Sequence, residues 1–269
     1  MVDSAKVTEL LAEAAESIIL PRFGNLSDDQ IRTKSSPTDL VTEVDVETEA
    51  FLKSALEKIA PATSFIGEEA AAADPSIVAA IEGEGRYWIL DPLDGTRNFV
   101  RGVDEFATIL ALVENGVAVM GWIYAPILKA AAVVERGGGV TWNGAPVETR
   151  PYAGPKPTSL RSIGWLTGDW KDVLPPRLKA STIAQSSHCS AFAYLNLLWG
   201  DVDLKLSSRI HPWDHVAGAL MLQEAGGRAA FLSDASAVVD YAPSDSVDRP
   251  LLATAPGRDF SAIAAALLD

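Results

Sequence analysis

The sequence predicts a mixed fold, α+β or α/β, with antiparallel pairing in its sheet. Segments with apolar residues at helical spacing alternate with short runs of β-branched and aromatic residues, which are typical of strands. Asn115-Gly116 joins two such runs and predicts a tight β-hairpin. Asn143-Gly144 marks a second tight turn. Hairpins of this kind pair neighbouring strands in antiparallel fashion.

The N-terminal third is predicted to contain both helices and strands. Pro21 ends the first helix and Pro75 interrupts an alanine-rich one, because proline cannot continue the helical hydrogen bonds. The predicted elements are a helix over residues 4–20, a helix over 45–59, a strand at 64–66, an interrupted helix over 70–81 and a strand at 86–90.

The rest of the chain is predicted to begin rich in strands and to end in helices. The predicted elements are strands at 106–114, 117–124 and 130–135, a helix at 191–199, a strand at 202–206, a helix at 213–225, a strand at 251–253 and a helix at 261–268. Residues 150–180 contain five prolines and predict a variable loop or a subdomain junction. We expect residues 1–269 to form a single domain.

The charge balance excludes two classes of partner. The 269 residues include 22 Lys and Arg and 36 Asp and Glu, so the formal net charge is −14. Nucleic acids and anionic membranes both require a basic face, so we expect neither as a partner. Cys189 is the single cysteine, which fits a reducing compartment. The N-terminal segment is amphipathic and carries acidic residues, unlike a signal peptide, so we expect a soluble cytoplasmic protein.

Two carboxylates follow the predicted strand at 86–90. Asp91 and Asp94 belong to the hexapeptide Asp-Pro-Leu-Asp-Gly-Thr, which we expect to form a tight turn that brings them together. Two carboxylates so close repel unless a cation lies between them. Mg²⁺ prefers such oxygen ligands, and two Mg²⁺ ions can clamp the reacting oxygens in a displacement at phosphorus. The alternative is that Asp-Pro and Asp-Gly are only turn formers.

Other acidic residues stand at strand ends and helix starts. Glu68 follows a short strand, and Asp45 and Asp214 lie at the starts of predicted helices. Each alone has an ordinary explanation as a solvated side chain or a helix cap, with Thr42 as another cap for the first of these helices. Taken together, and without a matching set of His or Cys, they indicate a hard metal ion and a phosphate substrate.

Several motifs along the chain resemble those of the inositol monophosphatase family. They are Gly67-Glu68-Glu69, the run from Trp88 to Phe99 around Asp91-Pro92-Leu93-Asp94-Gly95-Thr96, Trp213-Asp214-His215-Val216-Ala217-Gly218, Glu224-Ala225-Gly226-Gly227, the segment from Lys34 to Asp45 and the Asn143-Gly144 turn. The resemblance covers most of the chain and is weakest at 150–190. It implies an α+β fold layered as an α-β-α-β-α sandwich, of the inositol monophosphatase and fructose-bisphosphatase type, and a homodimer.

The resemblance also implies a ligand set for two or three Mg²⁺ ions. Glu68, Asp91 and the main-chain carbonyl of Leu93 would hold the first ion. Asp91, Asp94 and Asp214 would hold the second, so that Asp91 bridges the two. Glu68 would also help to hold a weaker third ion through water.

The same resemblance implies the catalytic pair and the phosphate contacts. Thr96 and Asp45 would orient and deprotonate the attacking water, next to the catalytic Glu68. The N–H groups of Gly95 and Thr96 lie at a predicted helix start and would cradle the phosphate.

The residues on the alcohol side of the substrate depart from the family pattern. The family's Gly-Ser/Thr-Ala loop falls here on His188-Cys189-Ser190-Ala191. Ser207 stands seven positions before Asp214, where the family usually has a glutamate that binds ring hydroxyls. We predict that this loop, Ser207 and Asp214 contact the substrate, with His188 as the best candidate. As a thiol, Cys189 is more typical of a small buried residue than of a nucleophile.

Two cations lie beside Ser207 in the sequence. Lys205 and Arg209 are expected to be solvated surface cations, since such residues are mostly exposed. The alternative is that they meet an anionic or polar group of the substrate. His211 and His215 flank the Asp214 motif and are expected to support the site or to lie on the surface.

The sequence therefore predicts a Mg²⁺-dependent phosphomonoesterase that hydrolyses a small phosphorylated alcohol resembling inositol monophosphate with activated water. Alternative substrates are histidinol phosphate, a sugar bisphosphate and a 3′-phosphonucleotide. A different alternative is a regulatory or binding protein whose hydrolysis is incidental.

Overall fold

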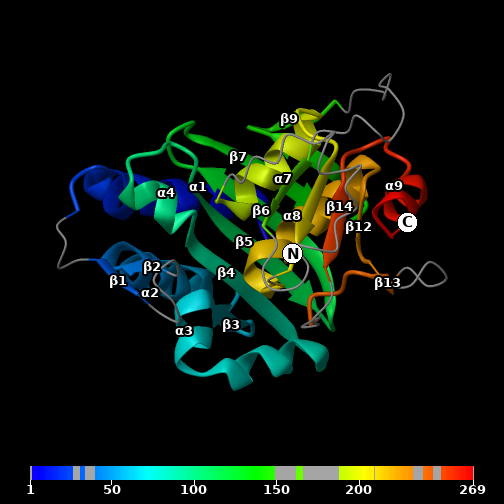
Figure 1. Cartoon of the computed structure of the whole chain (residues 1–269). Helices are drawn as coiled ribbons and strands as arrows, with labels where there is room; N and C mark the ends of the chain where they lie inside the picture. Colours follow the sequence, from blue (N-terminus) through cyan, green and yellow to red (C-terminus); the bar gives the residue numbers. More distant parts are fainter. Residues whose placement is uncertain are drawn as a thin grey trace.

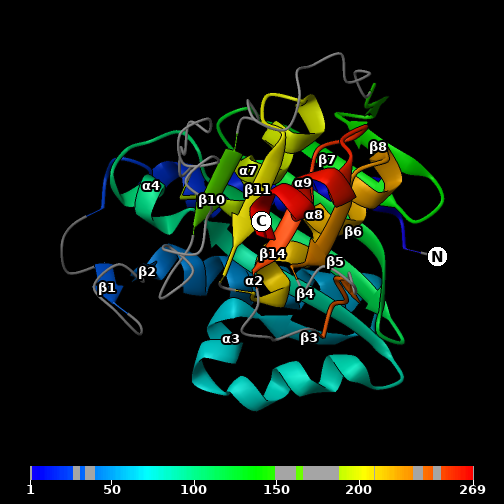
Figure 2. The same ribbon diagram turned by 45° about the vertical axis from the view of Figure 1, so that its right-hand side comes forward.

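The computed structural model describes residues 2–26, 31–33, 40–148, 162–165, 188–208, 210–232, 239–244 and 250–268. Within these ranges the strands form a seven-stranded sheet, a five-stranded sheet and a two-stranded ribbon. Helices cover both faces of each large sheet, which gives layers in the order α-β-α-β-α (Figure 1 and Figure 2). The predicted α+β layered sandwich is confirmed.

The seven-stranded sheet has the order β3-β4-β5-β6-β7-β8-β9. The β3–β4 pair is parallel and all other neighbours are antiparallel. The strands are β3 (Ser64–Gly67), β4 (Arg86–Asp94), β5 (Ala107–Glu114), β6 (Val117–Ala125), β7 (Ala130–Glu135), β8 (Gly139–Trp142) and β9 (Ala145–Pro146). Asn115 and Gly116, both at positive φ, join β5 to β6 as predicted.

Alternate residues of β4 pack on opposite faces of this sheet. Trp88 and Leu90 pack in a core cluster with residues of α1 (Ser4–Ala14) and α2 (Glu43–Ile59). Ile89 packs on the other face, in the cluster that contains α7 (Ser190–Trp199) and α8 (Pro212–Ala225). Strand β4 therefore carries Asp91, the next residue in the Ile89 series, toward the layer of α7 and α8.

The five-stranded sheet has the order β10-β11-β14-β12-β13. Its strands are β10 (Ser162–Trp165), β11 (Leu204–Ser207), β12 (Arg228–Phe231), β13 (Val239–Asp240) and β14 (Leu251–Thr254). Leu204, Leu206 and Leu252 pack against α9 (Phe260–Leu268), while Leu251 and Ala253 belong to the cluster that contains α7 and α8. This sheet is thus covered on both faces.

The remaining elements are short. Helix α1 continues into a π-helical turn, η1 (Ala15–Ile19), and a 3₁₀ turn, η2 (Leu20–Arg22), which contains Pro21. The others are β1 (Ile31–Thr33) and β2 (Leu40–Thr42), which form the ribbon, α3 (Glu68–Ala73), the 3₁₀ segment η4 (Pro75–Glu82) and α4 (Thr96–Val100).

Most predicted elements are confirmed to within a few residues, with two corrections. The tight turn expected at 91–95 is wrong, because β4 continues to Asp94 and its register against β5 shifts between Asp91 and Asp94. Pro92 has no N–H to donate, which suits a bulge and not a regular ladder. Seven short strands among the described residues were not predicted, because two to four residues give too short a pattern; they are β1, β2, β8, β9, β10, β12 and β13.

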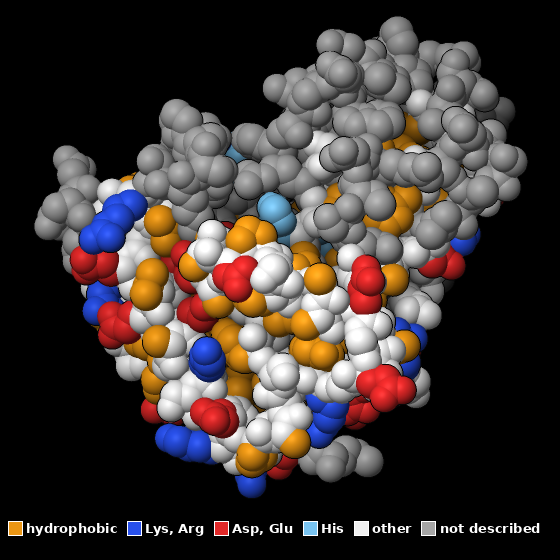
Figure 3. Space-filling view, turned by 90° about the horizontal axis from the view of Figure 1, so that it is seen from below, with side chains coloured by type: hydrophobic (Ala, Val, Ile, Leu, Met, Phe, Trp, Pro, Cys, Tyr) orange, Lys and Arg blue, Asp and Glu red, His pale blue; other side chains and the backbone are white. Residues whose placement is uncertain are grey.

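Parts of the prediction lie outside the described residues. These parts are residues 34–39, Arg209 and most of the predicted junction at 150–180, of which only β10 is described. Among the residues that are described, no helix combines the length and apolar character needed to cross a bilayer. On the face shown in Figure 3, acidic and basic side chains are interspersed and form no basic patch.

Candidate active site

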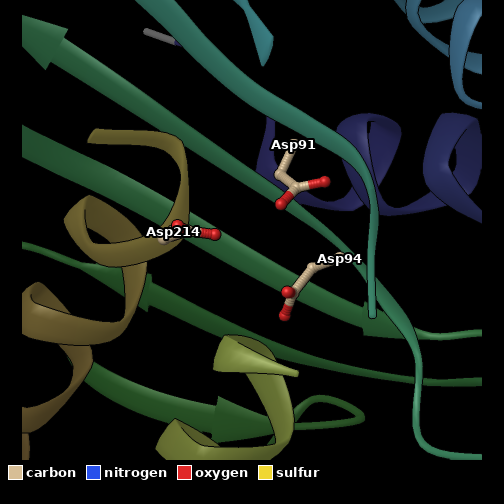
Figure 4. Close-up of side chains that lie close together, drawn as sticks. All are labelled: Asp91, Asp94 and Asp214. Carbon is tan, nitrogen blue, oxygen red and sulfur yellow. The ribbon is translucent and has the colours of Figure 1, made fainter. Parts of the chain in front are cut away.

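Three carboxylates from two distant segments meet between the seven-stranded sheet and α8. Asp91 and Asp94 come from the bulged end of β4, and Asp214 from the first turn of α8 (Figure 4). One oxygen of each lies within 4.8 Å of those of the other two. Asp91 and Asp94 are buried and Asp214 is partly exposed. We call Asp91, Asp94 and Asp214 the acidic cluster.

The acidic cluster carries more negative charge than a buried site can hold unaided. Burial raises the pKa of Asp91 well above its ordinary value of 3.8, and the charges of Glu68, Asp94 and Asp214 raise it further. Burial also raises the pKa of Asp94. A divalent cation that prefers oxygen ligands offsets both the burial of these carboxylates and their mutual repulsion, so these donors fit Mg²⁺.

The first turn of α7 holds Asp94. The Ala191 N–H donates to Asp94 Oδ2 at 2.5 Å, and the Cys189 thiol donates to the same oxygen at 3.1 Å. Cys189 is buried, and burial raises the pKa of its thiol well above 9.0, so that the thiol keeps its proton and acts as a donor. The predicted substrate loop thus contains a residue that orients a cluster carboxylate.

A second hydrogen-bonded chain connects Asp91 to α2. The Leu93 N–H donates to Asp91 Oδ1 at 3.0 Å. The Thr96 hydroxyl lies 2.9 Å from the Leu93 carbonyl and 3.1 Å from Asp45 Oδ1, and either oxygen can accept its single proton. Asp45 Oδ2 accepts the Thr42 N–H at 2.8 Å and the Thr42 hydroxyl at 2.7 Å.

Thr42 is the N-cap of α2, and Asp45 completes its capping box. Thr42, the alternative cap considered in the sequence analysis, is therefore the N-cap in the structure, and the helix begins at Glu43. The capping box fixes Asp45 with one oxygen toward Thr96. This arrangement places a hydroxyl and a carboxylate in contact at the edge of the acidic cluster.

Gly95 lets the chain turn from β4 into α4. Its φ is +86°, and a Cβ there would lie 2.9 Å from the Glu105 carbonyl, so only glycine fits without a shift. Gly95 is the N-cap of α4, a helix of five residues, and precedes Thr96. The two residues predicted to contact phosphate thus lie directly after Asp94.

Glu68 stands at the first position of α3 and acts on Asp91 as its strongest neighbouring charge. It is not part of the three-residue acidic cluster. The residue that holds the start of α3 in place is Glu49, which was not predicted from the sequence. The Glu49 carboxylate accepts the Glu69 N–H at 2.9 Å and the Ala70 N–H at 3.0 Å, and so caps α3 from α2.

A signal for Glu49 was present in the sequence. Asp45, Thr48, Glu49, Leu52 and Leu56 are buried on one face of α2. A glutamate among apolar residues on the buried face of a helix requires a partner, and here the partner is the start of α3.

Gly67→Ala should lower the free energy of unfolding by about 1–3 kcal/mol, the usual cost of overpacking. A Cβ at Gly67 would overlap the Glu49 carboxylate, so the alanine displaces the α3 cap. Urea unfolding of the variant measures the loss. Gly83→Ala is the matched control, since its Cβ would meet its nearest neighbour at an ordinary 3.4 Å. Equal stability of the two variants would contradict the packing argument.

The residues predicted to contact the substrate differ in their exposure to solvent. His188 is partly exposed, with φ +50°, and its pKa is lowered by burial and by the charges of Arg97 and Arg101. Ser190 begins α7 beside Asp94. Ser207 is only 6% exposed, on β11. His188 and Ser190 therefore remain accessible, whereas Ser207 lies within the protein.

The surface position expected for Lys205 is wrong. Lys205 is 5% exposed, and its ammonium donates to Ser207 Oγ at 2.7 Å. The five-stranded sheet has helices on both faces, so no residue of β11 faces solvent. His215 is also buried and contacts the Tyr194 hydroxyl at 3.0 Å, whereas His211 stacks on Trp213 and is partly exposed.

Comparisons with known proteins agree with this architecture. The model of a family described as the inositol monophosphatase family matches residues 3–266. A fructose-1,6-bisphosphatase/inositol-1-monophosphatase of Thermotoga maritima is 33% identical over 201 residues, 74% of each chain. A histidinol-phosphatase of Mycobacterium tuberculosis is 29% identical over 237 residues, 86% of this chain and 88% of that protein. The crystal structure of the extragenic suppressor protein SuhB from Bartonella henselae has a TM-score of 0.79 at 23% identity and covers 98% of both chains.

Proposed function

Because the chain belongs to the inositol monophosphatase family and is thus a phosphoric monoester hydrolase, we propose that it is a Mg²⁺-dependent phosphomonoesterase acting on a small phosphorylated alcohol. The acidic cluster carries this proposal. Three carboxylates that meet at one point, two of them buried, need a hard cation, and such cations activate water against phosphate esters.

We propose the ligand set that the family resemblance implies, and the meeting of Asp91, Asp94 and Asp214 supports it for one of the two ions. Glu68, Asp91 and the Leu93 carbonyl would hold one Mg²⁺. Asp91, Asp94 and Asp214 would hold the other. When bound, Mg²⁺ acidifies water and neutralises the charge of the phosphoryl group. The contacts of Asp91 with Leu93 N–H and of Asp94 with Ala191 N–H keep both carboxylates in orientation before a ligand arrives.

Thr96 and Asp45 would take a proton from the attacking water, and their contact supports this role. The Thr96 hydroxyl donates toward Asp45 Oδ1, so its lone pairs can accept a proton from water while its own proton moves to Asp45. The two donors from Thr42 keep the Asp45 carboxylate from rotating away. The backbone after Asp94, at Gly95 and Thr96, would contact the phosphate.

The alcohol side of the site favours a substrate with a second anionic group. Arg97 and Arg101 place positive charge beside His188, at the start of the predicted substrate loop. Guanidinium groups bind phosphate and carboxylate well and neutral polyols less well. A sugar bisphosphate or a phosphonucleotide therefore fits this side better than a neutral polyol monophosphate.

The homodimer that the family resemblance implies stays a prediction.

Phosphate release from a panel of phosphomonoesters, with and without Mg²⁺, tests the proposal. The panel is inositol 1-phosphate, histidinol phosphate, fructose 1,6-bisphosphate and 3′-phosphoadenosine 5′-phosphate. We expect Mg²⁺-dependent turnover with one doubly anionic compound preferred, and a loss of that preference in Arg97→Gln. Asp94→Asn, which should stop turnover of every compound, is the control for contaminating phosphatases.

Two outcomes would contradict this reading. Turnover that is independent of Mg²⁺ would exclude the proposed chemistry. No turnover by protein that binds Mg²⁺ would favour the regulatory alternative, which predicts that Asp94→Asn keeps the biological role.

A further inference from the structure

Lys205 occupies an unusual position for a lysine. In β11, Leu204 and Leu206 face α9, so Lys205 and Ser207 face the opposite layer, where α7 and α8 lie. The side chain is 5% exposed. A buried ammonium is costly and is rarely found without a compensating charge.

The contacts of the ammonium tie it to α8, which carries Asp214, and to α7, whose first turn holds Asp94. Its Nζ lies 2.7 Å from Ser207 Oγ, 3.4 Å from His215 Nδ1 in α8 and 4.7 Å from the centre of the Tyr194 ring in α7. In the described residues these partners are a hydroxyl and two rings, and none is a carboxylate. The compensating charge therefore acts over a longer distance.

That charge comes from the acidic cluster. His215 directly follows Asp214 in the first turn of α8, and the first turn of α7 holds Asp94. Burial lowers the pKa of Lys205 to about 8, while Asp214 and then Asp94 favour its charged form. The ammonium therefore lies in contact with the residue that follows Asp214, and its positive charge acts on Asp214 and Asp94.

We propose that Lys205 is a built-in counter-cation of the acidic cluster, a positioning residue that steadies Asp94 and Asp214 without metal and weakens the binding of Mg²⁺ to them. This inference rests on the proposed metal-dependent function. An ammonium and a Mg²⁺ ion that share the same carboxylates repel each other through a medium of low effective dielectric constant. Removing the ammonium should thus improve metal binding even though it harms the metal-free protein.

Calorimetric titration of Mg²⁺ into metal-free protein tests this. We expect the Kd of Lys205→Met to fall by at least about tenfold relative to wild type. The metal-free variant should melt at a lower temperature than metal-free wild type, and saturating Mg²⁺ should reduce that difference. Leu206→Met, a neighbouring core substitution on the other face of β11, should leave the Kd unchanged.

The direction of the change separates this role from a merely structural one, because a loosened site binds metal less tightly. An unchanged or higher Kd in folded Lys205→Met would overturn the inference while leaving the proposed function intact. If Lys205→Met does not fold, Lys205→Gln and Lys205→Arg replace it in the titration. Tighter Mg²⁺ binding by Lys205→Gln but not by Lys205→Arg supports the inference. Equal Kd values for these two variants overturn it. Absence of Mg²⁺ binding by wild type would overturn the proposed function and this inference together.

Discussion

Asp91→Asn is expected to lower Mg²⁺-dependent phosphate release by at least about 10³-fold, because a metal ion supplies several kcal/mol of transition-state stabilisation and the proposed ligand set assigns Asp91 to both ions. The asparagine oxygen can still accept the Leu93 N–H, so the local backbone should be preserved. Steady-state rates over a wide range of Mg²⁺ concentration measure the loss.

The same substitution should stabilise the metal-free protein at neutral pH. The pKa of Asp91 is raised above 3.8 in the folded state, so between these two values the folded protein holds a proton that the unfolded chain has released. The free energy of unfolding of the metal-free wild type therefore falls as the pH rises from 3.8 through the raised pKa. Asp91→Asn removes this pH dependence, and urea unfolding at several pH values would show it.

Two comparisons make the Asp91 result decisive. Asp104→Asn removes an exposed carboxylate from the loop after α4 and should change neither the rate nor the stability. Mg²⁺ should raise the melting temperatures of wild type and of Asp104→Asn by similar amounts. It should raise the melting temperature of Asp91→Asn much less. A wild-type rate for Asp91→Asn at saturating Mg²⁺ would remove Asp91 from the proposed ligand set.

Thr96→Val is expected to lower kcat by about 10²–10⁴-fold, the usual contribution of a positioned proton acceptor. Valine keeps the shape of threonine but cannot pass a proton to Asp45 Oδ1 or donate to the Leu93 carbonyl. Kinetics at saturating Mg²⁺ and substrate measure the effect. Titration with Mg²⁺ should give a Kd close to that of wild type, because the carboxylates of the acidic cluster are unchanged.

Thr96→Ser is the matched control for this second prediction. It keeps the hydroxyl and should keep most of the activity. If Thr96→Val is as active as wild type, the attacking water does not depend on this hydroxyl. If both variants lose activity equally, the methyl group matters for packing and the proton-transfer role is not supported.

Helices and strands were predictable wherever the apolar residues recur at one clear spacing or a turn motif stands between two strands. The strand at 86–90, the hairpin at Asn115-Gly116 and the helix at 213–225 appear in the structure as β4, the β5–β6 hairpin and α8. Short elements such as β8 and β12 were missed, since pairing with other strands of the sheet defines them more than their own four residues do.

The order of acidic motifs led to the family and to its phosphatase chemistry, which the comparisons confirm. It also predicted a set of carboxylate ligands, of which the structure brings Asp91, Asp94 and Asp214 together. It did not predict how they are held. The contacts of Glu49 with α3 and of Cys189 with Asp94 join separate segments of the chain, so the pattern of α2 signals that Glu49 needs a partner but does not identify that partner.

The sequence by itself thus determined most of the longer elements, the layered α+β class and the phosphatase family, because these depend on periodicity and on motifs that are local in the chain. The tertiary structure alone decided how Asp91, Asp94 and Asp214 are held in place, and that Lys205 is buried. The physical reason is that both depend on layer packing. Helix α8 carries Asp214 to the bulged end of β4, and a sheet covered on both faces leaves the lysine of β11 no route to solvent.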